Sequence, residues 1–140
     1  MRGYRCPLDE TTTADPFYGP GNYATNNLVF ASRARLPADI PDGTSCTVLF
    51  AEKYAACSYW ALAKGEQVPW YVADQESGFE NRPAACDPRR PQTAHRGGMP
   101  VGMGDSSVHF VSRSINAATW FAANTPAGKE ELGSGLYTDW

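Results

Sequence analysis

The sequence predicts a single α+β domain with a small antiparallel sheet, long loops and a short C-terminal helix. The 140-residue chain carries 13 glycines and 11 prolines from end to end, a density of turn residues typical of short strands joined by long connections. Residues 47–52 and 107–112 are rich in apolar and β-branched side chains, and residues 115–123 form an alanine-rich run of helical length. A chain of this length suits one core, so we expect residues 1–140 to form one domain.

The N-terminal part of the chain predicts an arm followed by the middle of the sheet. Residues 1–27 are polar and rich in turn residues, which favours an extended arm lying over the domain. Residues 28–30 form the first short strand candidate. Residues 40–45 predict a turn or helical start, in which Gly43 supplies an easy positive φ. Residues 47–52 are apolar, β-branched and bounded by turn signals, so we expect them to form the central strand.

The middle of the chain is less regular. Residues 54–63 suit either a strand or a short amphipathic helix, and their pattern leaves both open. Residues 68–72 predict an edge strand, because Pro69 has no N–H to donate to a neighbouring strand. Residues 74–98 predict a long loop, and a loop of this length in a small domain is usually functional or tied down, here by Cys86.

Residues 99–112 predict a C-terminal hairpin, whose second strand begins at Ser107. Side chains alternate along a strand, so Val108 and Phe110 share one face. We expect these two side chains to point into the core and His109 to point outward.

Residues 115–123 predict the closing helix, with Ser114 or Asn116 as its N-cap. We expect the helix to bury Ile115, Trp120 or Phe121 against the sheet. The turn residues 125–128 should end it.

The four cysteines favour disulfides over a zinc site. They are Cys6, Cys46, Cys57 and Cys86, with no Cys-x-x-Cys spacing and only two histidines in the chain. Four cysteines allow three pairings; Cys57 with Cys86 is favoured, because Cys46 lies where a strand should bury it. Buried free thiols are the alternative. Disulfides would place the protein outside the reducing cytosol.

Charge and hydropathy exclude several classes of function. The net charge is −3 and only 19% of residues are charged, which argues against a nucleic-acid partner. The chain has no apolar stretch long enough to span a bilayer. A catalytic constellation of His95, Asp105 and a serine can be drawn, with Ser106, Ser107 or His109 nearby, but there is no Gly-x-Ser-x-Gly turn to present the nucleophile. We therefore expect His95 to bond the backbone or Asp105 near the base of the hairpin.

Three segments, taken in order, resemble one family, the planctomycete-type pilin-like proteins. Residues 4–9 and 22–24 are similar to its Cys-Pro and Asn-Tyr-Ala segments, and residues 41–52 to its Asp-Gly-Thr-Ser strand entry and closing Gly-Glu. Residues 95–120 are similar to its C-terminal region, in which His is followed after nine residues by Asp-Gly. The resemblance marks these residues, for which we expect structural roles: Asp42, Gly43, Thr44, His95, Gly97, Gly98, Asp105 and Phe110.

The sequence departs from the family pattern at three places. Ser106 stands where the family has Gly, so we expect a different turn type, or Asp105 in the strained conformation. Cys46 stands where Asn is usual. The family's N-terminal methylation helix is absent, and by resemblance it preceded Met1.

The resemblance implies a non-enzymatic pilin-like or pseudopilin-like head, which acts in an extracytoplasmic filament or in an assembly of the type II secretion kind. Its partners would be other pilin-like subunits or further copies of itself, and it would reach the membrane only through the missing helix. Related secretion pseudopilins bind calcium with loop oxygens, so a calcium site is a further expectation. Its candidate ligands would be Asp74, Glu76, Glu80 and Asp87.

A secreted ligand-binding or carbohydrate-binding module is the alternative function. Aromatic residues make up 12% of the chain, and Trp60, Trp70, Tyr71 and Trp140 could line a sugar platform. Such side chains also bury large apolar areas in small cores, so burial would exclude them from a platform.

Overall fold

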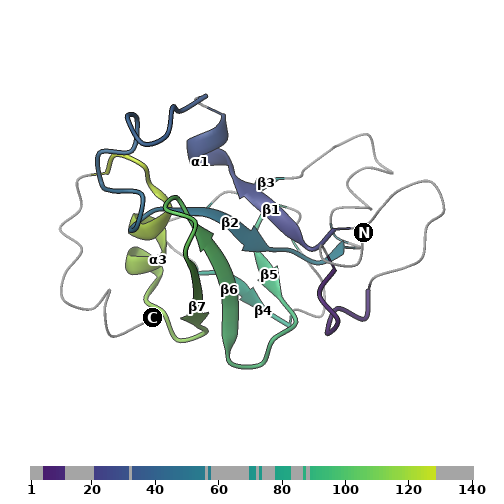
Figure 1. The fold of residues 1–140 in the computed structure, drawn as a ribbon. Coiled ribbons are helices and arrows are strands. Elements are labelled where there is room, and N and C mark those ends of the chain that lie inside the picture. The colour runs from purple at the N-terminus through teal and green to yellow at the C-terminus, as the bar shows by residue number, and fades with distance from the viewer. Residues whose placement is uncertain are drawn as a thin grey trace.

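The fold is a five-stranded sheet with a helix packed on one face (Figure 1). The computed structural model describes residues 5–11, 21–31, 33–55, 57, 70–71, 73, 78–82, 87 and 89–128. The strands of the sheet are β1 (Tyr23–Asn26), β2 (Val48–Glu52), β3 (Trp70–Tyr71), β6 (Gly98–Met103) and β7 (Val108–Ser112). The other described elements are α1 (Asn27–Phe30), β4 (Glu80–Asn81), β5 (Gln92–Thr93) and α3 (Ala117–Asn124).

The sheet has the order β3-β1-β2-β6-β7, so β2 is its middle strand. The pairs β1–β2, β2–β6 and β6–β7 are antiparallel, whereas β3 runs parallel to β1 at the edge. β4 and β5 form a separate small parallel pair inside the long loop. The α+β class, the central strand and the edge strand are therefore confirmed.

The core lies between the sheet and α3. Trp120 of α3 is fully buried and contacts the rings of Tyr71 and Phe79, with centroids 6.4 and 5.5 Å away. Met99 and Val111 of the hairpin belong to the same buried cluster. A buried tryptophan of this kind is typically worth about 3–5 kcal/mol against alanine, which makes α3 the main cover of this face.

The closing helix is confirmed, and its ends follow local chemistry. The Asn116 side chain accepts a hydrogen bond from Ala118 N at 2.8 Å, as an N-cap does. At the other end, Thr125 N donates to the carbonyls of Phe121 and Ala122.

The first strand lies earlier than the sequence predicted. Residues 28–30, expected to form a strand, lie in α1, and β1 occupies the end of the segment expected to be an extended arm. The change of structure occurs at Asn26, whose side-chain oxygen accepts from Leu28 N at 3.0 Å and so caps α1. The helix cap formed by Asn26 therefore outweighs the tendency of the apolar residues after it to form a strand.

The hairpin is confirmed and His109 is exposed as expected, but the prediction that Val108 and Phe110 point into the core is wrong. Val108 and Phe110 are 74% and 50% exposed, whereas Val111 is completely buried. Val111 pairs with the buried Met99, which fixes it on the face covered by α3. Both alternating sets of side chains on β7 contain apolar residues, so the alternation itself did not indicate which face is covered.

The hairpin turn has the different geometry expected from its serine. Ser106 N donates to the Met103 carbonyl at 3.2 Å, and Met103 N donates to the Ser107 carbonyl at 2.9 Å. This pattern is that of a three-residue hairpin loop closed by one left-handed residue. Ser106 itself takes the left-handed conformation, at φ +73°, and the alternative expectation that Asp105 carries it is wrong.

Candidate functional site

The face of the sheet opposite α3 exposes large apolar side chains. Tyr23 of β1 and Phe50 of β2 are 45% and 43% exposed, and Val108 and Phe110 extend the exposed surface across β7. Strand register places Phe50 beside Gly102 and Gly102 beside Val108, so these side chains lie on one face. We call the surface formed by Tyr23, Phe50, Pro100, Val108 and Phe110 the apolar face.

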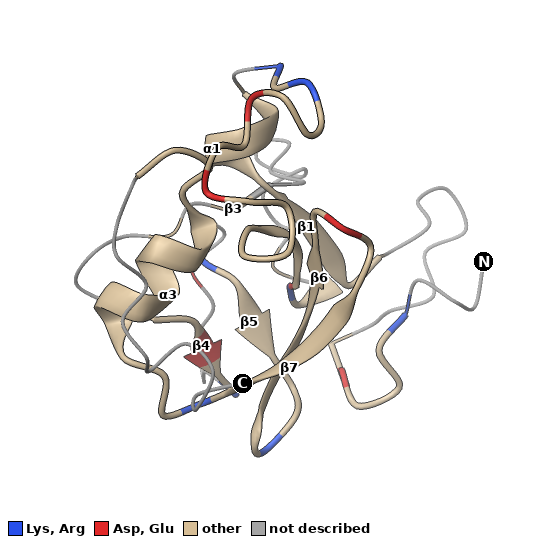
Figure 2. Cartoon of the chain, turned by 60° about the vertical axis from the view of Figure 1, so that its left-hand side comes forward, with Lys and Arg blue, Asp and Glu red and all other residues tan. Residues whose placement is uncertain are grey.

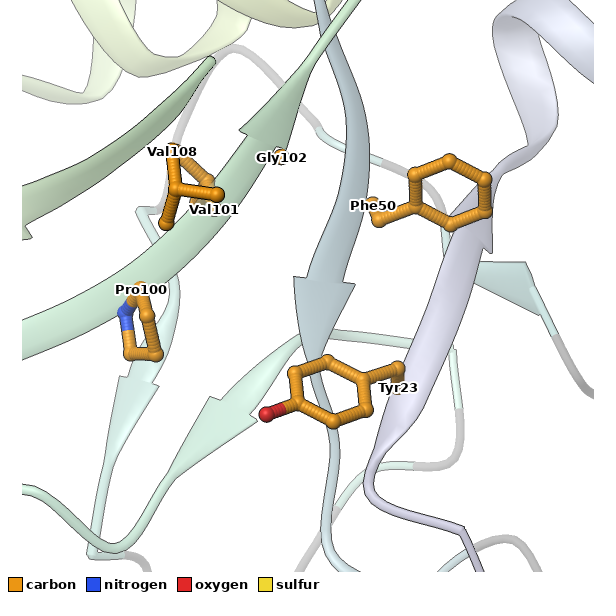
Figure 3. A pocket seen from close by; sticks show the side chains of 6 residues that line it. All are labelled: Tyr23, Phe50, Pro100, Val101, Gly102 and Val108. Carbon is orange, nitrogen blue, oxygen red and sulfur yellow. The ribbon is translucent and has the colours of Figure 1, made fainter. Parts of the chain in front are cut away.

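A groove crosses the apolar face (Figure 3). Its volume is about 380 Å³, and it is lined by Tyr23, Phe50, Pro100, Val101, Gly102 and Val108. Gly102 has no side chain to fill the groove, whereas a Cβ at this position would lie 3.6 Å from the Phe50 side chain. The Tyr23 hydroxyl is the one polar side-chain atom among these residues.

The strands beneath the apolar face carry almost no charge. β1, β6 and β7 contain no Lys, Arg, Asp or Glu, and Glu52 of β2 is buried. Figure 2 shows β6 and β7 without charged colouring, with most acidic and basic residues on loops and turns. A contiguous, uncharged apolar surface on a folded domain is typical of a protein-binding surface.

His95 and Asp105 lie at opposite ends of β6, so the expected contact between them is not formed. His95 precedes the strand, and its Nε2 lies 3.5 Å from Cys6 Sγ and 3.3 Å from Glu52 Oε1. Asp105 lies in the turn, where its Oδ1 accepts from Ser107 N at 2.9 Å. Hydrogen bonds from Ser107 lower the pKa of the Asp105 carboxyl. The structure therefore brings together no triad of His95, Asp105 and a serine.

The two glycines after His95 allow close packing at the base of the hairpin. A Cβ on Gly98 would lie 1.9 Å from the Val111 carbonyl oxygen, so no larger residue fits there. A Cβ on Gly97 would lie 3.7 Å from the Phe110 ring. The Phe110 ring also meets the His95 ring edge-on, with centroids 6.1 Å apart.

Asp42, Gly43 and Thr44 lie at the other end of the hairpin. Gly43 takes φ +99° in the predicted turn, and Asp42 Oδ2 accepts from Gly128 N at 2.8 Å. The Thr44 carbonyl accepts from Asp105 N at 3.1 Å. This turn therefore holds the hairpin loop on one side and the chain after α3 on the other.

The cysteines fall in three environments. Cys6 and Cys46 are free thiols, and burial, followed by the nearby Glu52 carboxylate, raises the pKa of Cys6. Cys46 is half-buried just before β2 rather than inside the strand. Cys57 is buried. Cys86 lies outside the described residues, so its pairing with Cys57 stays a prediction.

The described acids of the proposed calcium site have other partners. Glu80 forms an ion pair with Arg90 at 3.4 Å, and Asp87 Oδ1 accepts from Arg89 N at 2.8 Å. Asp74 and Glu76 lie outside the described residues.

The aromatic platform loses one of its four candidates. Tyr71 is completely buried, and its hydroxyl donates to Asn124 Oδ1 at 2.6 Å. Trp60 and Trp140 lie outside the described residues, and Trp70 lies in β3. A sugar platform therefore cannot use Tyr71.

Neither the apolar face nor the contacts of His95 were predicted from the sequence. The signal available for the face was an excess of apolar residues on β7, where Val108, Phe110 and Val111 together put apolar side chains on both faces. A strand that is apolar on both faces predicts that both faces are covered.

Comparison with known families matches residues 3–118 to SBP_bac_10, protein of unknown function (DUF1559). The chain belongs to this family. No curated protein and no solved structure matches it. This DUF1559 domain has, within the residues that the structure describes, no helix long and apolar enough to cross a membrane.

Proposed function

We propose that this DUF1559 domain is the head of a non-enzymatic, pilin-like structural subunit, which assembles with further copies of itself through the apolar face. The observation that carries the proposal is the exposure of Tyr23, Phe50, Val108 and Phe110 on one uncharged side of the sheet. The resemblance of the sequence to pilin-like proteins supports the same role and favours an assembly outside the cytoplasm.

The energetics of the apolar face favour association. Burying an apolar side chain completely contributes about 1.5–3 kcal/mol, and these side chains retain roughly half of their surface for a partner. The lack of charge on β1, β6 and β7 means that little desolvation of ionised groups opposes contact. An exposed apolar surface of this kind also suits a symmetric, self-complementary interface.

The absence of enzymatic activity belongs to the same proposal. Ser107 Oγ lies 3.1 Å from His109 Nε2, but it donates to Asp105 Oδ1 on the same exposed turn. In a serine triad the acid bonds and orients the histidine instead of the serine. We assign the motif residues around both ends of β6 to holding the hairpin, and hence the apolar face, in shape.

A ligand-binding module remains the alternative, because the groove volume of about 380 Å³ lies within the range of small-molecule sites. The lining disfavours a sugar, since carbohydrate hydroxyls need several hydrogen-bonding partners and the groove side chains offer only the Tyr23 hydroxyl. The same apolar lining suits a protein surface better.

Sedimentation equilibrium of the 140-residue chain tests the proposal. We expect wild type to self-associate in a concentration-dependent way and Val108→Glu to weaken this association at least tenfold. Leu36→Glu is the matched control, since Leu36 is 51% exposed but does not line the groove. A wild type that stays monomeric up to about 1 mM, where an association of about 4 kcal/mol is detectable, would overturn the proposal.

A further inference from the structure

Three metal-binding side chains from distant parts of the chain meet beside the apolar face. Cys6, Glu52 at the end of β2 and His95 before β6 each offer one ligand atom, and these atoms lie within 4.8 Å of one another. His95 Nε2 is 3.5 Å from Cys6 Sγ and 3.3 Å from Glu52 Oε1. Cys6 and Glu52 are buried, and the His95 side chain is 31% exposed.

The arrangement differs from that of a cysteine nucleophile with its base. In such a site the imidazole uses one nitrogen for the thiol and the other for the orienting acid. Here Cys6 Sγ and Glu52 Oε1 both approach the same nitrogen, Nε2. Three ligand atoms gathered around one point are the arrangement of a metal site.

The distances fit a tetrahedral ion. Zn²⁺ lies about 2.3 Å from a thiolate sulfur and about 2.0–2.2 Å from imidazole nitrogen or carboxylate oxygen. Tetrahedral angles then put sulfur and nitrogen about 3.5 Å apart, and nitrogen and oxygen about 3.4 Å apart. The two separations from His95 Nε2, 3.5 and 3.3 Å, match these edges, and the Cys6 sulfur and the Glu52 oxygen also lie within 4.8 Å of each other.

We propose that Cys6, Glu52 and His95 bind one Zn²⁺ ion, with the fourth position open to solvent on the His95 side. The thiolate and the carboxylate together balance the two positive charges of the ion, so the buried site is neutral when it is loaded. Three protein ligands and one open position are the pattern of zinc sites that hold a water or a further ligand.

The surrounding hydrogen bonds hold the ligands in place before any ion binds. Thr93 Oγ1 donates to Glu52 Oε2 at 2.5 Å and accepts from His95 N at 3.2 Å, so one side chain links two ligands. Cys6 N donates to Asn22 Oδ1 at 2.8 Å. Asn81 Nδ2 donates to the His95 carbonyl at 2.7 Å. Such supporting bonds are typical of sites organised for a metal.

The positions of the three ligands in the sequence support the same inference. Each of the three segments that resemble the pilin-like family contributes one ligand, Cys6 from the first, Glu52 from the second and His95 from the third. The fold brings these segments to one place, although Cys6 and His95 are 89 residues apart.

Metal titration of the 140-residue chain under argon tests the site, with Zn²⁺ for affinity and Co²⁺ for ligand type. We expect one ion per chain and a thiolate-to-cobalt charge-transfer band. Cys6→Ser should abolish the band, and Cys6→Ser, Glu52→Gln and His95→Gln should each lower Zn²⁺ affinity by at least about 100-fold, more than the loss of a merely supporting residue. Cys46→Ser and His109→Gln, the matched controls, should leave both measurements unchanged.

Circular dichroism of each metal-free variant separates a lost ligand from a lost fold. If Glu52→Gln unfolds, Cys6→Ser and His95→Gln decide the question. Wild type that binds Zn²⁺ no more tightly than Cys6→Ser, or controls that lose as much affinity as the ligand variants, would overturn the proposal. The metal site and the assembly proposal are tested independently. Sedimentation measures association through the apolar face, whereas metal titration measures binding by the three ligands.

Discussion

Ser106, in the turn of the hairpin, has a left-handed backbone conformation that residues with a side chain disfavour. Its φ of +73° costs a non-glycine residue about 1 kcal/mol. We expect Ser106→Gly to raise the free energy of unfolding by about 0.5–1 kcal/mol, measured by urea denaturation. Ser107→Gly is the control, and it should be destabilising because it removes the hydroxyl that donates to Asp105 Oδ1. An unchanged or lower stability of Ser106→Gly would contradict the turn geometry.

Gly98 permits the close approach of β6 and β7. Because a Cβ there would lie 1.9 Å from the Val111 carbonyl oxygen, the two strands must separate to accept it. We expect Gly98→Ala to lower the free energy of unfolding by about 3 kcal/mol or more. Gly78→Ala, where a Cβ meets nothing within 4 Å, should have a small effect, and equal losses in the two variants would show this account of Gly98 to be wrong.

Lys53 makes stability depend on pH. Burial lowers its pKa from 10.5 to about 8, against the opposing effect of Asp87, so the unfolded chain binds more protons between these values. Stability contributed by Lys53 should therefore rise with pH from about 8 to 10.5, by up to about 3 kcal/mol. Urea denaturation of wild type and Lys53→Met isolates this effect, because Cys6 and Tyr71 titrate in both proteins. A stability difference between them that is constant with pH would contradict it.

The junction of β1 and α1 depends on one buried amide. Asn26 Nδ2 donates to the carbonyls of Val48 and Asn124 at 2.8 and 2.7 Å, and its oxygen caps α1. Asn26→Ala leaves two buried carbonyls without this donor, so we expect a loss of about 2–4 kcal/mol in thermal or urea unfolding. Asn116→Ala, which removes only an exposed cap from α3, should cost about 1 kcal/mol. Similar losses in the two variants would mean that the buried bonds of Asn26 contribute little.

The elements that the sequence predicted are those with local signals. β2 has a β-branched apolar run, the hairpin has its turn residues, and α3 has a capping asparagine. β1 was missed because Asn26, a polar residue typical of turns, is buried in the sheet. The facing of β7 was predicted wrongly because the choice between its two apolar faces depends on where α3 packs.

The two candidate sites could not be predicted from local sequence patterns, because each joins residues that are distant in the sequence. The apolar face combines residues of four strands, and it is exposed because α3 packs on the opposite face of the sheet. The contact of Cys6 with His95 joins residues 89 positions apart. Sequence spacing indicated neither arrangement, because both depend on strand order and register.

At the scale of the whole molecule, the sheet has two apolar faces and the described structure covers one of them. α3 closes the first with Trp120, and the second exposes Tyr23, Phe50 and Val108. The proposed role of the motif residues at the two ends of β6 is to hold this second face in shape. In the proposed function this second face is the surface for assembly, and the cluster of Cys6, Glu52 and His95 lies at its border.

Photo-crosslinking from position 108 in cells that produce the protein tests this organisation most directly. A photoreactive phenylalanine at Val108 should crosslink to a second copy of the chain, at residues of the same apolar face, as identified by mass spectrometry. The same group at Ala127, which is exposed beyond α3, should give no such product. If position 108 yields no more crosslinked dimer than position 127, the apolar face is not an assembly surface.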